Sequence, residues 1–351
     1  MTVIPQGAIR FNTDSQKLEF FAQDQWFEMV IDTPDLAVGS NTEAGARGVW
    51  AGGGGSTGAV NVIQYINISS TGNAQDFGDL SSAAAGNGGS GSGSNTRGLF
   101  HGTGANINID YITISSTGNA QNFGNSTLTG GIYDGNYAAA LSNGTRGIGA
   151  GGWTSLNHPV YPAYNVIEYV TISSTGNAVD FGDLTVGRLR TPGCASPTRG
   201  LFFAGANDGP VSTRYKSIDF ISIATLGNAQ NFGDLTTQKV TGSSCSNSIR
   251  GLYFGGSSGP SPSPLTNSIE YVTIATLGNA VDFGDLTSAR NSQTSLSSST
   301  RGVSNGGYAP SVNNTIDYVT ISSTGNAVDF GDLLNNSSTH AWCCSNAHGG
   351  L

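Results

Sequence analysis

The segment Tyr169–Leu184 reads YVTISSTGNAVDFGDL, and close copies of it occur six times along the chain. Each copy joins a stretch of alternating polar and apolar residues to a T-G-N or L-G-N turn and then to a D-F-G-D phrase or a near variant. The alternation predicts a strand with one buried face, and Gly and Asn accept a positive φ in the turn at little cost. The copies begin at Tyr65, Tyr111, Tyr169, Phe220, Tyr271 and Tyr318. The segment therefore predicts a β-hairpin that recurs along a repeat fold.

An Arg-Gly pair precedes every copy and gives the period of the repeat. The arginines are separated by 49 to 53 residues and are Arg47, Arg97, Arg146, Arg199, Arg250 and Arg301. A unit of this length holds four short strands, represented by Gln293–Ser298, Gly251–Phe254, Ile269–Ile274 and Ala280–Leu286. Such a period excludes most helical repeats, so the chain is predicted to be all-β.

A Gly pair follows the second strand of several units, at Gly151-Gly152, Gly255-Gly256 and Gly306-Gly307. A four-stranded unit with this pair resembles the kelch repeat of β-propellers. The kelch pattern expects a Trp in the fourth strand, whereas the units carry Phe77, Phe123, Phe181, Phe232, Phe283 and Phe330. These Phe residues are expected to pack between blades, while the flanking Asp or Asn caps a turn.

The two ends of the chain are predicted to complete one further blade. Residues 1–30 fit the second, third and fourth strands of a unit, with Trp26 in the role of the kelch Trp, but they lack a first strand. Residues 344–351 align with 245–252 and would supply it. We therefore expect a single domain, 1–351, that forms a seven-bladed kelch-like propeller, with six full repeats over about 31–333 and a split seventh blade from 1–30 and 334–351. The alternative is an independent module at Gly7–Val30, which resembles small attachment modules in virion proteins of tailed bacteriophages.

The composition favours turns and short strands and argues against some partners. Gly accounts for 52 of 351 residues, charged residues make up 11%, and the net charge is −9. An acidic chain argues against nucleic acid as the main partner, because duplex binding needs a basic face. No apolar run is long enough for a transmembrane helix, and Met1–Arg10 lacks the apolar region of a secretory signal. We expect a chain that folds in a cytoplasm and does not insert into membranes.

Cysteines and arginines recur in register with the repeat. Cys194 and Cys245 each lie five residues before a repeat Arg, and Cys344, which follows Cys343, aligns with them. We expect small buried residues in the innermost strand and no disulfides. The repeat arginines are expected to make interblade hydrogen bonds or ion pairs with nearby acids, and a ring of anion sites is the alternative. The acids are Asp110, Glu168, Asp219, Glu270 and Asp317.

No group of residues predicts catalysis, a metal site or a cofactor. Asp180-Phe181-Gly182 matches a kinase tripeptide, but it recurs along the repeat without the other kinase motifs. Paired acids such as Asp282 and Asp285 favour turn capping, and a Ca²⁺ site is the alternative, which would need six to eight converging oxygens. The four histidines occupy unrelated repeat positions and lack metal-ligand spacing. We therefore expect a non-enzymatic protein without a cofactor.

The loops between the second and third strands differ most from unit to unit and form the predicted binding rim. Loops on a rigid scaffold commonly carry recognition, and aromatic side chains in loops suit sugar rings or protein anchors. The alternative is that some of these rings fold back on their own loops. The residues of the predicted binding rim are Trp153, His158, Tyr161, Tyr164, Tyr215 and Tyr308.

The phrase S-T-G-N-A-x-D-F-G-D-L, together with Gly7–Val30, resembles structural and fibre proteins of tailed bacteriophages. The resemblance implies a virion protein that is assembled in the host cytoplasm and has other virion proteins as partners. The expected function is host attachment, as part of a tail fibre that binds a surface glycan or protein. The alternatives are a capsid or tail decoration protein without a host ligand, and a glycan-active enzyme. No coiled-coil heptads are present, so a homo-oligomer would have to use a propeller face or rim.

Overall fold

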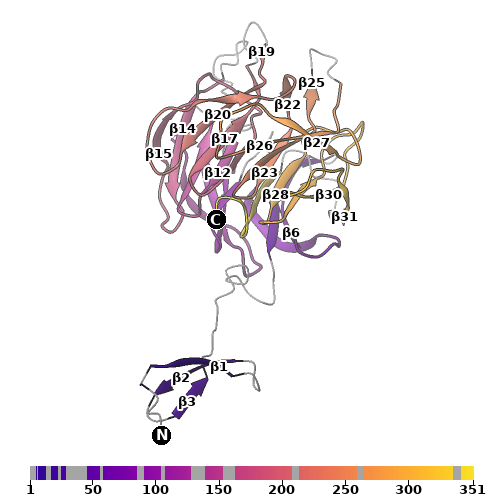
Figure 1. Cartoon of the computed structure of the whole chain (residues 1–351). Helices are drawn as coiled ribbons and strands as arrows, with labels where there is room; N and C mark the ends of the chain where they lie inside the picture. Colours follow the sequence, from indigo (N-terminus) through magenta and orange to yellow (C-terminus); the bar gives the residue numbers. More distant parts are fainter. Residues whose placement is uncertain are drawn as a thin grey trace. The chain divides into compact units, whose positions relative to one another are not determined.

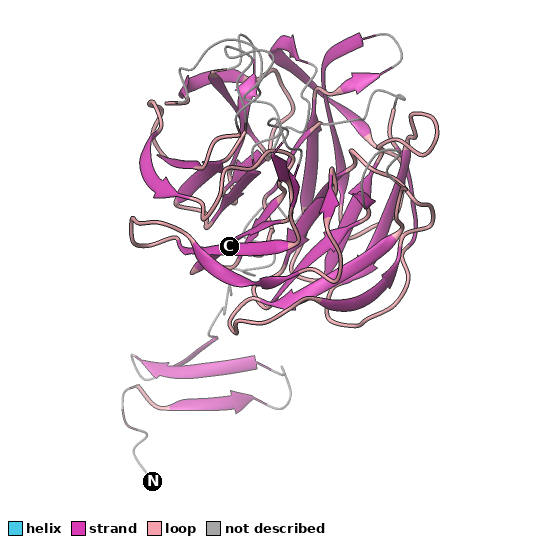
Figure 2. Cartoon of the chain, turned by 90° about the horizontal axis from the view of Figure 1, so that it is seen from above, coloured by secondary structure: helices cyan, strands magenta, loops and turns pink. Residues whose placement is uncertain are grey.

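The computed structural model describes most of the chain, and every regular element in the described part is a β-strand (Figure 2). The described residues are 5, 7–12, 17–22, 25–28, 46–55, 58–84, 91–103, 107–127, 139–152, 163–207, 213–258, 264–334 and 341–351. The chain divides into two compact units, Met1–Gly39 and Ser40–Leu351. The expected all-β class is therefore confirmed, and each unit has its own strands.

The first unit is a three-stranded antiparallel sheet. Its strands are β1 (Ile9–Asn12), β2 (Lys17–Ala22) and β3 (Gln25–Glu28), in the order β1-β2-β3. Trp26 contacts the ring of Phe21 edge-on at 5.3 Å, and the Arg10 guanidinium lies 4.1 Å from the Trp26 ring centre. Arg10 also pairs with Glu19 at 2.8 Å. The expected role of Trp26 as the kelch Trp of a propeller blade is not confirmed, because Trp26 packs within this three-stranded sheet.

The second unit is a β-propeller of six blades, each a four-stranded antiparallel sheet (Figure 1). The first strand of each blade lines the centre of the ring, and the fourth is outermost. The blades, from inside to outside, are as follows: blade 1, β32 (Trp342–Ser345), β4 (Arg47–Ala51), β6 (Gly58–Asn67) and β7 (Gln75–Ala84), with β5 (Gly54–Gly55) also paired to β6; blade 2, β8 (Gly91–Gly93), β9 (Arg97–Thr103), β10 (Asn108–Thr113) and β11 (Gln121–Asn125); blade 3, β12 (Ala139–Ser142), β13 (Arg146–Ala150), β14 (Val166–Thr171) and β15 (Val179–Asp183); blade 4, β16 (Gly193–Ala195), β17 (Arg199–Phe203), β20 (Ser217–Ser222) and β21 (Gln230–Asp234); blade 5, β23 (Ser243–Ser246), β24 (Arg250–Phe254), β26 (Ser268–Thr273) and β27 (Val281–Asp285); blade 6, β28 (Thr294–Ser297), β29 (Arg301–Asn305), β30 (Thr315–Thr320) and β31 (Val328–Asp332).

The C-terminal strand completes blade 1 rather than a seventh blade. β32 pairs with β4, with Trp342 opposite Ala51 and Ser345 opposite Gly48. The seventh blade expected from residues 1–30 and 334–351 is not confirmed, because the strand it needed belongs to the blade that begins at Arg47. One blade is still shared by the two ends of the propeller unit, so the ring is closed without an open sheet edge at the seam.

Neighbouring blades are joined by the repeated turn and the repeated D-F-G-D phrase. At the junction of blades 3 and 4, Gly227 N donates to Phe181 O at 2.9 Å and Ala229 N donates to Asp183 O at 2.7 Å. Equivalent bonds occur at all six junctions, including blade 6 to blade 1. The Gly of the phrase is required by this contact, since a Cβ on Gly182 would lie 2.5 Å from the Gly227 carbonyl oxygen. The two phrases that define the repeat thus bind each other across every junction.

The core lies between the blades. Phe181 is 2% exposed and packs with Ile148 and Ile167 of its own blade and with Ile221 and Ile223 of the next blade. Phe283 is placed in the same way between blades 5 and 6. Each fourth-strand Phe also meets the aromatic ring of its own third strand edge-on, with centroids 5.8 to 6.1 Å apart.

Candidate functional site

The repeat arginines link adjacent blades through the backbone. Arg199 Nη1 donates to Ile274 O of the next blade at 3.0 Å, and its guanidinium lies 5.1 Å from the Phe220 ring centre. The same bond to the next blade and the same ring contact occur for Arg47, Arg97, Arg146, Arg250 and Arg301. The expected interblade hydrogen bond is present. The expected ion pair with the third-strand acids is not seen among the described residues, and in blades 4 to 6 a different cation pairs with the acid.

The third-strand acids of blades 4 to 6 form buried ion pairs with the segments that enter those blades. The pairs are Arg188–Asp219 at 3.1 Å, Lys239–Glu270 at 2.6 Å and Arg290–Asp317 at 2.9 Å. All six side chains are at most 2% exposed. The cations recur every 51 residues, three positions after the Thr that follows the fourth strand of the preceding blade. Sequence reasoning missed these pairs, although this spacing was a usable signal.

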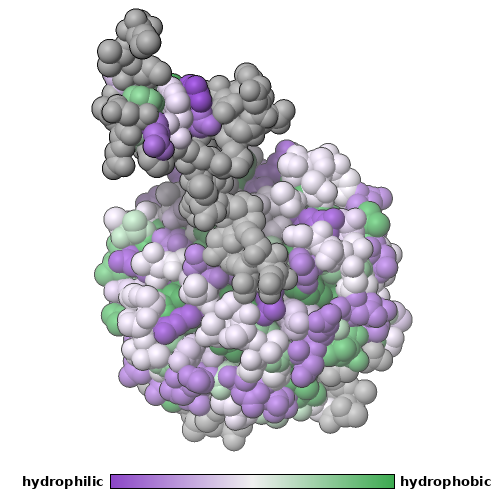
Figure 3. Space-filling model, turned by 90° about the horizontal axis from the view of Figure 1, so that it is seen from below, coloured by the Kyte–Doolittle hydropathy of each residue, from purple (hydrophilic) through white to green (hydrophobic). Residues whose placement is uncertain are grey.

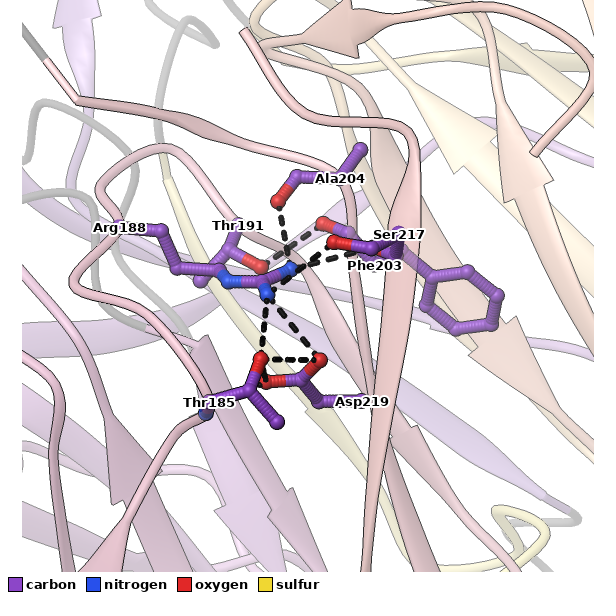
Figure 4. Close-up of polar contacts among 7 residues, drawn as sticks. All are labelled: Thr185, Arg188, Thr191, Phe203, Ala204, Ser217 and Asp219. Atoms are coloured by element: carbon purple, nitrogen blue, oxygen red, sulfur yellow. Dashed lines mark hydrogen bonds and ion pairs between the residues drawn. The ribbon is translucent and has the colours of Figure 1, made fainter. Parts of the chain in front are cut away.

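The Arg188 network shows what the pairs hold in place (Figure 4). Arg188 Nη1 donates to Ala204 O at 3.0 Å and to Ser217 O at 3.1 Å, on both sides of the loop between β17 and β20. Asp219 also accepts from Thr185, from the backbone N at 2.9 Å and from Oγ1. The Arg188 guanidinium therefore links the connector from blade 3 to both ends of the second-to-third-strand loop of blade 4 and to the buried Asp219.

Blades 2 and 3 keep the acid but lack this cation. Ala84 and Gly130 occupy the sequence positions that correspond to Arg188. Asp110 is fully buried, and its Oδ1 has no hydrogen-bond partner. In blade 3, the Glu168 carboxylate accepts hydrogen bonds from Ser126 and Thr127. Blade 1 carries the neutral Gln64 instead. The ring therefore has a half with buried ion pairs and a half without them.

The upper rim is the end of the ring that carries the second-to-third-strand loops and the connectors between blades (Figure 1). Two short ladders brace it: β18 (Ala206–Asn207) pairs with β19 (Thr213–Arg214), and β22 (Lys239–Val240) pairs with β25 (Ser257–Ser258). Leu189 and Asn291, in the connectors, form further bridges to Ala206 and Tyr308. In the described part of the upper rim, the loops and connectors of blades 4 to 6 are therefore joined by backbone hydrogen bonds.

A central cavity of about 110 Å³ is lined by the inner strands of all six blades and is open to the outside. The inner strands are sheet edges, whose backbone groups need partners. Serine hydroxyls supply them: Ser246 Oγ donates to Ala195 O at 2.7 Å, and Ser297 Oγ donates to Ser246 O at 2.7 Å. Ser345 and Ser142 make equivalent bonds to their neighbours. Serine and threonine are frequent among the described residues that line the cavity, although apolar atoms contribute most of its exposed wall.

The mouth of the cavity on blades 4 to 6 contains three residues in the left-handed backbone region. Arg190, Thr241 and Ser292 have φ values of 57°, 56° and 58°, and each lies two residues after a buried cation. Ser292 N donates to Thr241 O at 2.7 Å. Such conformations persist only where the surroundings fix them, and here the ion pairs and bridges do so.

Three cysteines lie in equivalent inner-strand positions and contact the Arg-Gly glycine of the next blade. A Cβ on Gly251 would lie 2.9 Å from Cys194 Sγ, and a Cβ on Gly302 would lie 3.0 Å from Cys245 Sγ. Cys344 takes the same place against Gly98. Burial raises the pKa of Cys194 to about 12. All four cysteines are free, and the three that pack in this way behave as small apolar side chains.

The Ser142–His348 pair is not arranged for nucleophilic catalysis. Ser142 Oγ lies 3.1 Å from His348 Nε2, but Gly350 N donates to His348 Nδ1 at 3.1 Å. The neutral ring must then carry its proton on Nε2, which points to Gly93 O at 2.9 Å and cannot act as the base for Ser142. Burial lowers the pKa of His348, which favours this neutral form. Over the described ranges, no three His, Cys, Asp or Glu side chains gather as metal ligands.

The predicted binding rim is only partly within the described residues. Trp153, His158 and Tyr161 lie outside them. Tyr164 and Tyr215 are half-buried, and Tyr215 lies with its ring centre 5.4 Å from the Arg188 guanidinium. Tyr308 is 46% exposed. Of the described members, Tyr308 alone presents a largely exposed ring.

Comparison with known proteins gave no family model that matches the chain and no curated protein that is significantly similar to it. In the part of the chain that the structure describes, no helix is both long and apolar enough to cross a membrane.

Proposed function

We propose that the chain is a non-enzymatic recognition protein of a virion, with a kelch-like propeller whose upper rim binds a host surface glycan or protein. The observation that carries this proposal is the bonded upper rim of blades 4 to 6. Three buried ion pairs and several backbone bridges hold loops that the repeat itself does not require. The virion setting and the place in a tail fibre rest on the resemblance of the repeat phrase and of Gly7–Val30.

Rigid loops favour binding because less conformational freedom is lost when a partner docks. Taking two charges out of water is costly, and a buried ion pair often adds little net stability over an apolar replacement. Hydrogen bonds from Arg188 to the carbonyls of Ala204 and Ser217 show that the buried charges fix loop positions. A role in holding the loops ready for binding therefore explains the buried ion pairs better than a contribution to stability does.

The test is binding of the purified, fluorescently labelled protein to candidate bacterial host cells. The comparison variant is Trp153→Ala/Tyr161→Ala, and the control is Ile249→Ala, at an exposed position in the turn between β23 and β24. The proposal expects saturable binding that the double variant weakens and the control keeps. A folded protein that binds none of the cells would contradict host recognition.

A second candidate function, a capsid or tail decoration protein, is favoured by exposed aliphatic residues at the lower ends of the outer strands. Blades 3, 5 and 6 begin their fourth strands with Val179, Val281 and Val328, all at least 50% exposed, whereas blades 1, 2 and 4 have Gln there. The turns of blades 4 and 5 add Leu226 and Leu277. An exposed Asp follows each Val in sequence. On the lower face, apolar and hydrophilic residues are interspersed (Figure 3).

Alternating apolar and acidic groups fit a partner surface that is apolar and basic, such as another virion protein of that character. The test is co-sedimentation of the purified protein with virions that lack it. Binding that Leu226→Asp/Leu277→Asp abolishes, without any binding to cells, would support decoration. Binding to cells that survives this substitution would favour host recognition instead.

A further inference from the structure

Tyr308 presents an exposed aromatic ring on a fixed backbone at the upper rim of blade 6. Its N donates to Asn291 O at 2.8 Å, and its O accepts from Asn291 N at 3.1 Å. A further bridge joins Tyr308 to Val312. Tyr308 is nevertheless 46% exposed, whereas the other described aromatic residues of the propeller are buried or half-buried. An anchored backbone with an exposed ring is a preformed platform.

Two uncharged polar side chains lie beside this platform. Asn291 Nδ2 donates to Ser257 Oγ at 2.8 Å, which fixes the amide and joins the rims of blades 5 and 6. Ser257 is 4% exposed, whereas Asn291 is half-buried. Within the described part of the chain, no protein group occupies the Asn291 amide oxygen or the Tyr308 hydroxyl. The site thus offers one ring face, one acceptor and one hydroxyl, without a charge.

The aromatic residue is not required by the repeat. Tyr308 follows Gly306-Gly307, and the residue that follows the corresponding pair is Ser257 in blade 5 and Ala206 in blade 4. Both smaller residues are compatible with the same backbone bridges between connector and loop. A large exposed ring at this position therefore serves something other than folding.

We propose that Tyr308 and Asn291, whose amide is held by the buried Ser257, form a subsite for a neutral pyranose ring. The flat, apolar face of such a sugar stacks on an aromatic ring, and its hydroxyls bond to an amide oxygen and a phenol hydroxyl. A phosphate, sulfate or carboxylate would instead need a cation, and a basic peptide would need an acid, but the three side chains carry neither. This inference rests on the proposed recognition function and names its ligand class and its place.

The test measures binding of neutral oligosaccharides of hexoses and N-acetylhexosamines by saturation-transfer NMR and calorimetry, with heparin as the anionic comparison. Tyr308→Phe keeps the ring, Tyr308→Ala removes it, and Ile249→Ala, at a 60% exposed position outside both proposed binding surfaces, is the control. We expect a neutral sugar to bind about tenfold more weakly to Tyr308→Ala, with Tyr308→Phe and Ile249→Ala within about threefold of the parent. Thermal unfolding verifies that all variants are folded.

Two results would overturn the subsite: no neutral oligosaccharide of the panel binds, or Tyr308→Ala binds as tightly as the parent. The cell assay separates this failure from that of the proposed function. Cell binding that persists in Tyr308→Ala leaves host recognition standing and removes the Tyr308 subsite. Loss of cell binding in Tyr308→Ala, but not in Tyr308→Phe, supports both.

Discussion

Asp219→Asn is the substitution that most sharply tests the role of the buried ion pairs. It keeps the shape of the side chain but leaves the Arg188 guanidinium, which is fully buried, without its counter-charge. Breaking a buried pair by removing one partner costs about 3–5 kcal/mol, because the remaining charge is uncompensated. At about 2–4 °C per kcal/mol, the expected fall in Tm is roughly 6–20 °C.

Asp110→Asn provides the matched control in blade 2. Asp110 occupies the equivalent third-strand position and is also fully buried, but no cation pairs with it. Its Oδ1 has no partner, and its Oδ2 accepts from Ser81 N and Oγ at 3.1 and 2.6 Å. An amide oxygen can accept the Ser81 bonds, so the expected cost is at most about 1 kcal/mol.

The assay is thermal and urea unfolding of both variants and of Arg188→Met/Asp219→Asn. Removing the guanidinium together with the carboxylate should recover at least half of the loss, since the uncompensated charge is gone. Equal losses for Asp219→Asn and Asp110→Asn would refute the reasoning. So would a double variant that is less stable than Asp219→Asn alone.

Three other perturbations test separate parts of the structure. Gly182→Ala should lower the free energy of unfolding in urea by about 1–3 kcal/mol, because the added Cβ would overlap the Gly227 carbonyl oxygen of the next blade. The control is Gly149→Ala, whose Cβ would meet no atom closer than 3.7 Å and which should leave the stability nearly unchanged. Cys194 should react with a thiol reagent at pH 7.5 only after the protein is unfolded, since burial raises its pKa to about 12, and all four thiols should react in the unfolded chain. Rapid labelling of Cys194 in the native protein would contradict its burial. The pKa of His348 is lower in the folded protein than its unfolded value of 6.5, so the unfolded state binds more protons in acid. The Tm should therefore fall as the pH drops through 6.5, and it should fall less in His348→Gln. An identical dependence of Tm on pH in the parent and in His348→Gln would contradict a buried, neutral His348.

The repeat itself was predictable from the sequence because its physical causes are local. Period-two alternation gives the third strand, and Gly and Asn give the turn after it. The inner-strand position of Cys194 followed from its fixed spacing to Arg199, and the structure places it there. The order of the four strands was therefore predicted correctly for blades 2 to 6, whereas the first strand of blade 1 comes from the C-terminal end of the chain.

The number of blades could not be predicted in the same way, because it depends on one long-range strand pairing. Residues 9–28 do form three antiparallel strands, as a partial blade would, but their alternation says nothing about the strand that lies beside them. A count of first strands offered a signal. Among the described strands, five precede the arginines from Arg97 to Arg301, and the C-terminal strand is the sixth.

The ion pairs of the upper rim escaped prediction because only one partner recurs throughout. A third-strand acid is present in five blades, whereas the cation occurs only in three, so Arg188 and its two equivalents did not stand out as a repeat feature. An Arg in a loop is normally exposed to water, so nothing in the sequence indicated that Arg188 is fully buried in the folded ring.

Thermal unfolding of two truncated chains tests the central claim most directly: a six-bladed ring closed by the C-terminal strand. The chain without residues 1–39 should keep the main unfolding transition of the full protein, because those residues form a unit of their own. The chain without residues 341–351 should lose that transition or show it at a much lower temperature, because blade 1 then lacks its inner strand. A propeller that collapses when residues 1–39 are removed, or that tolerates loss of 341–351, would contradict the account.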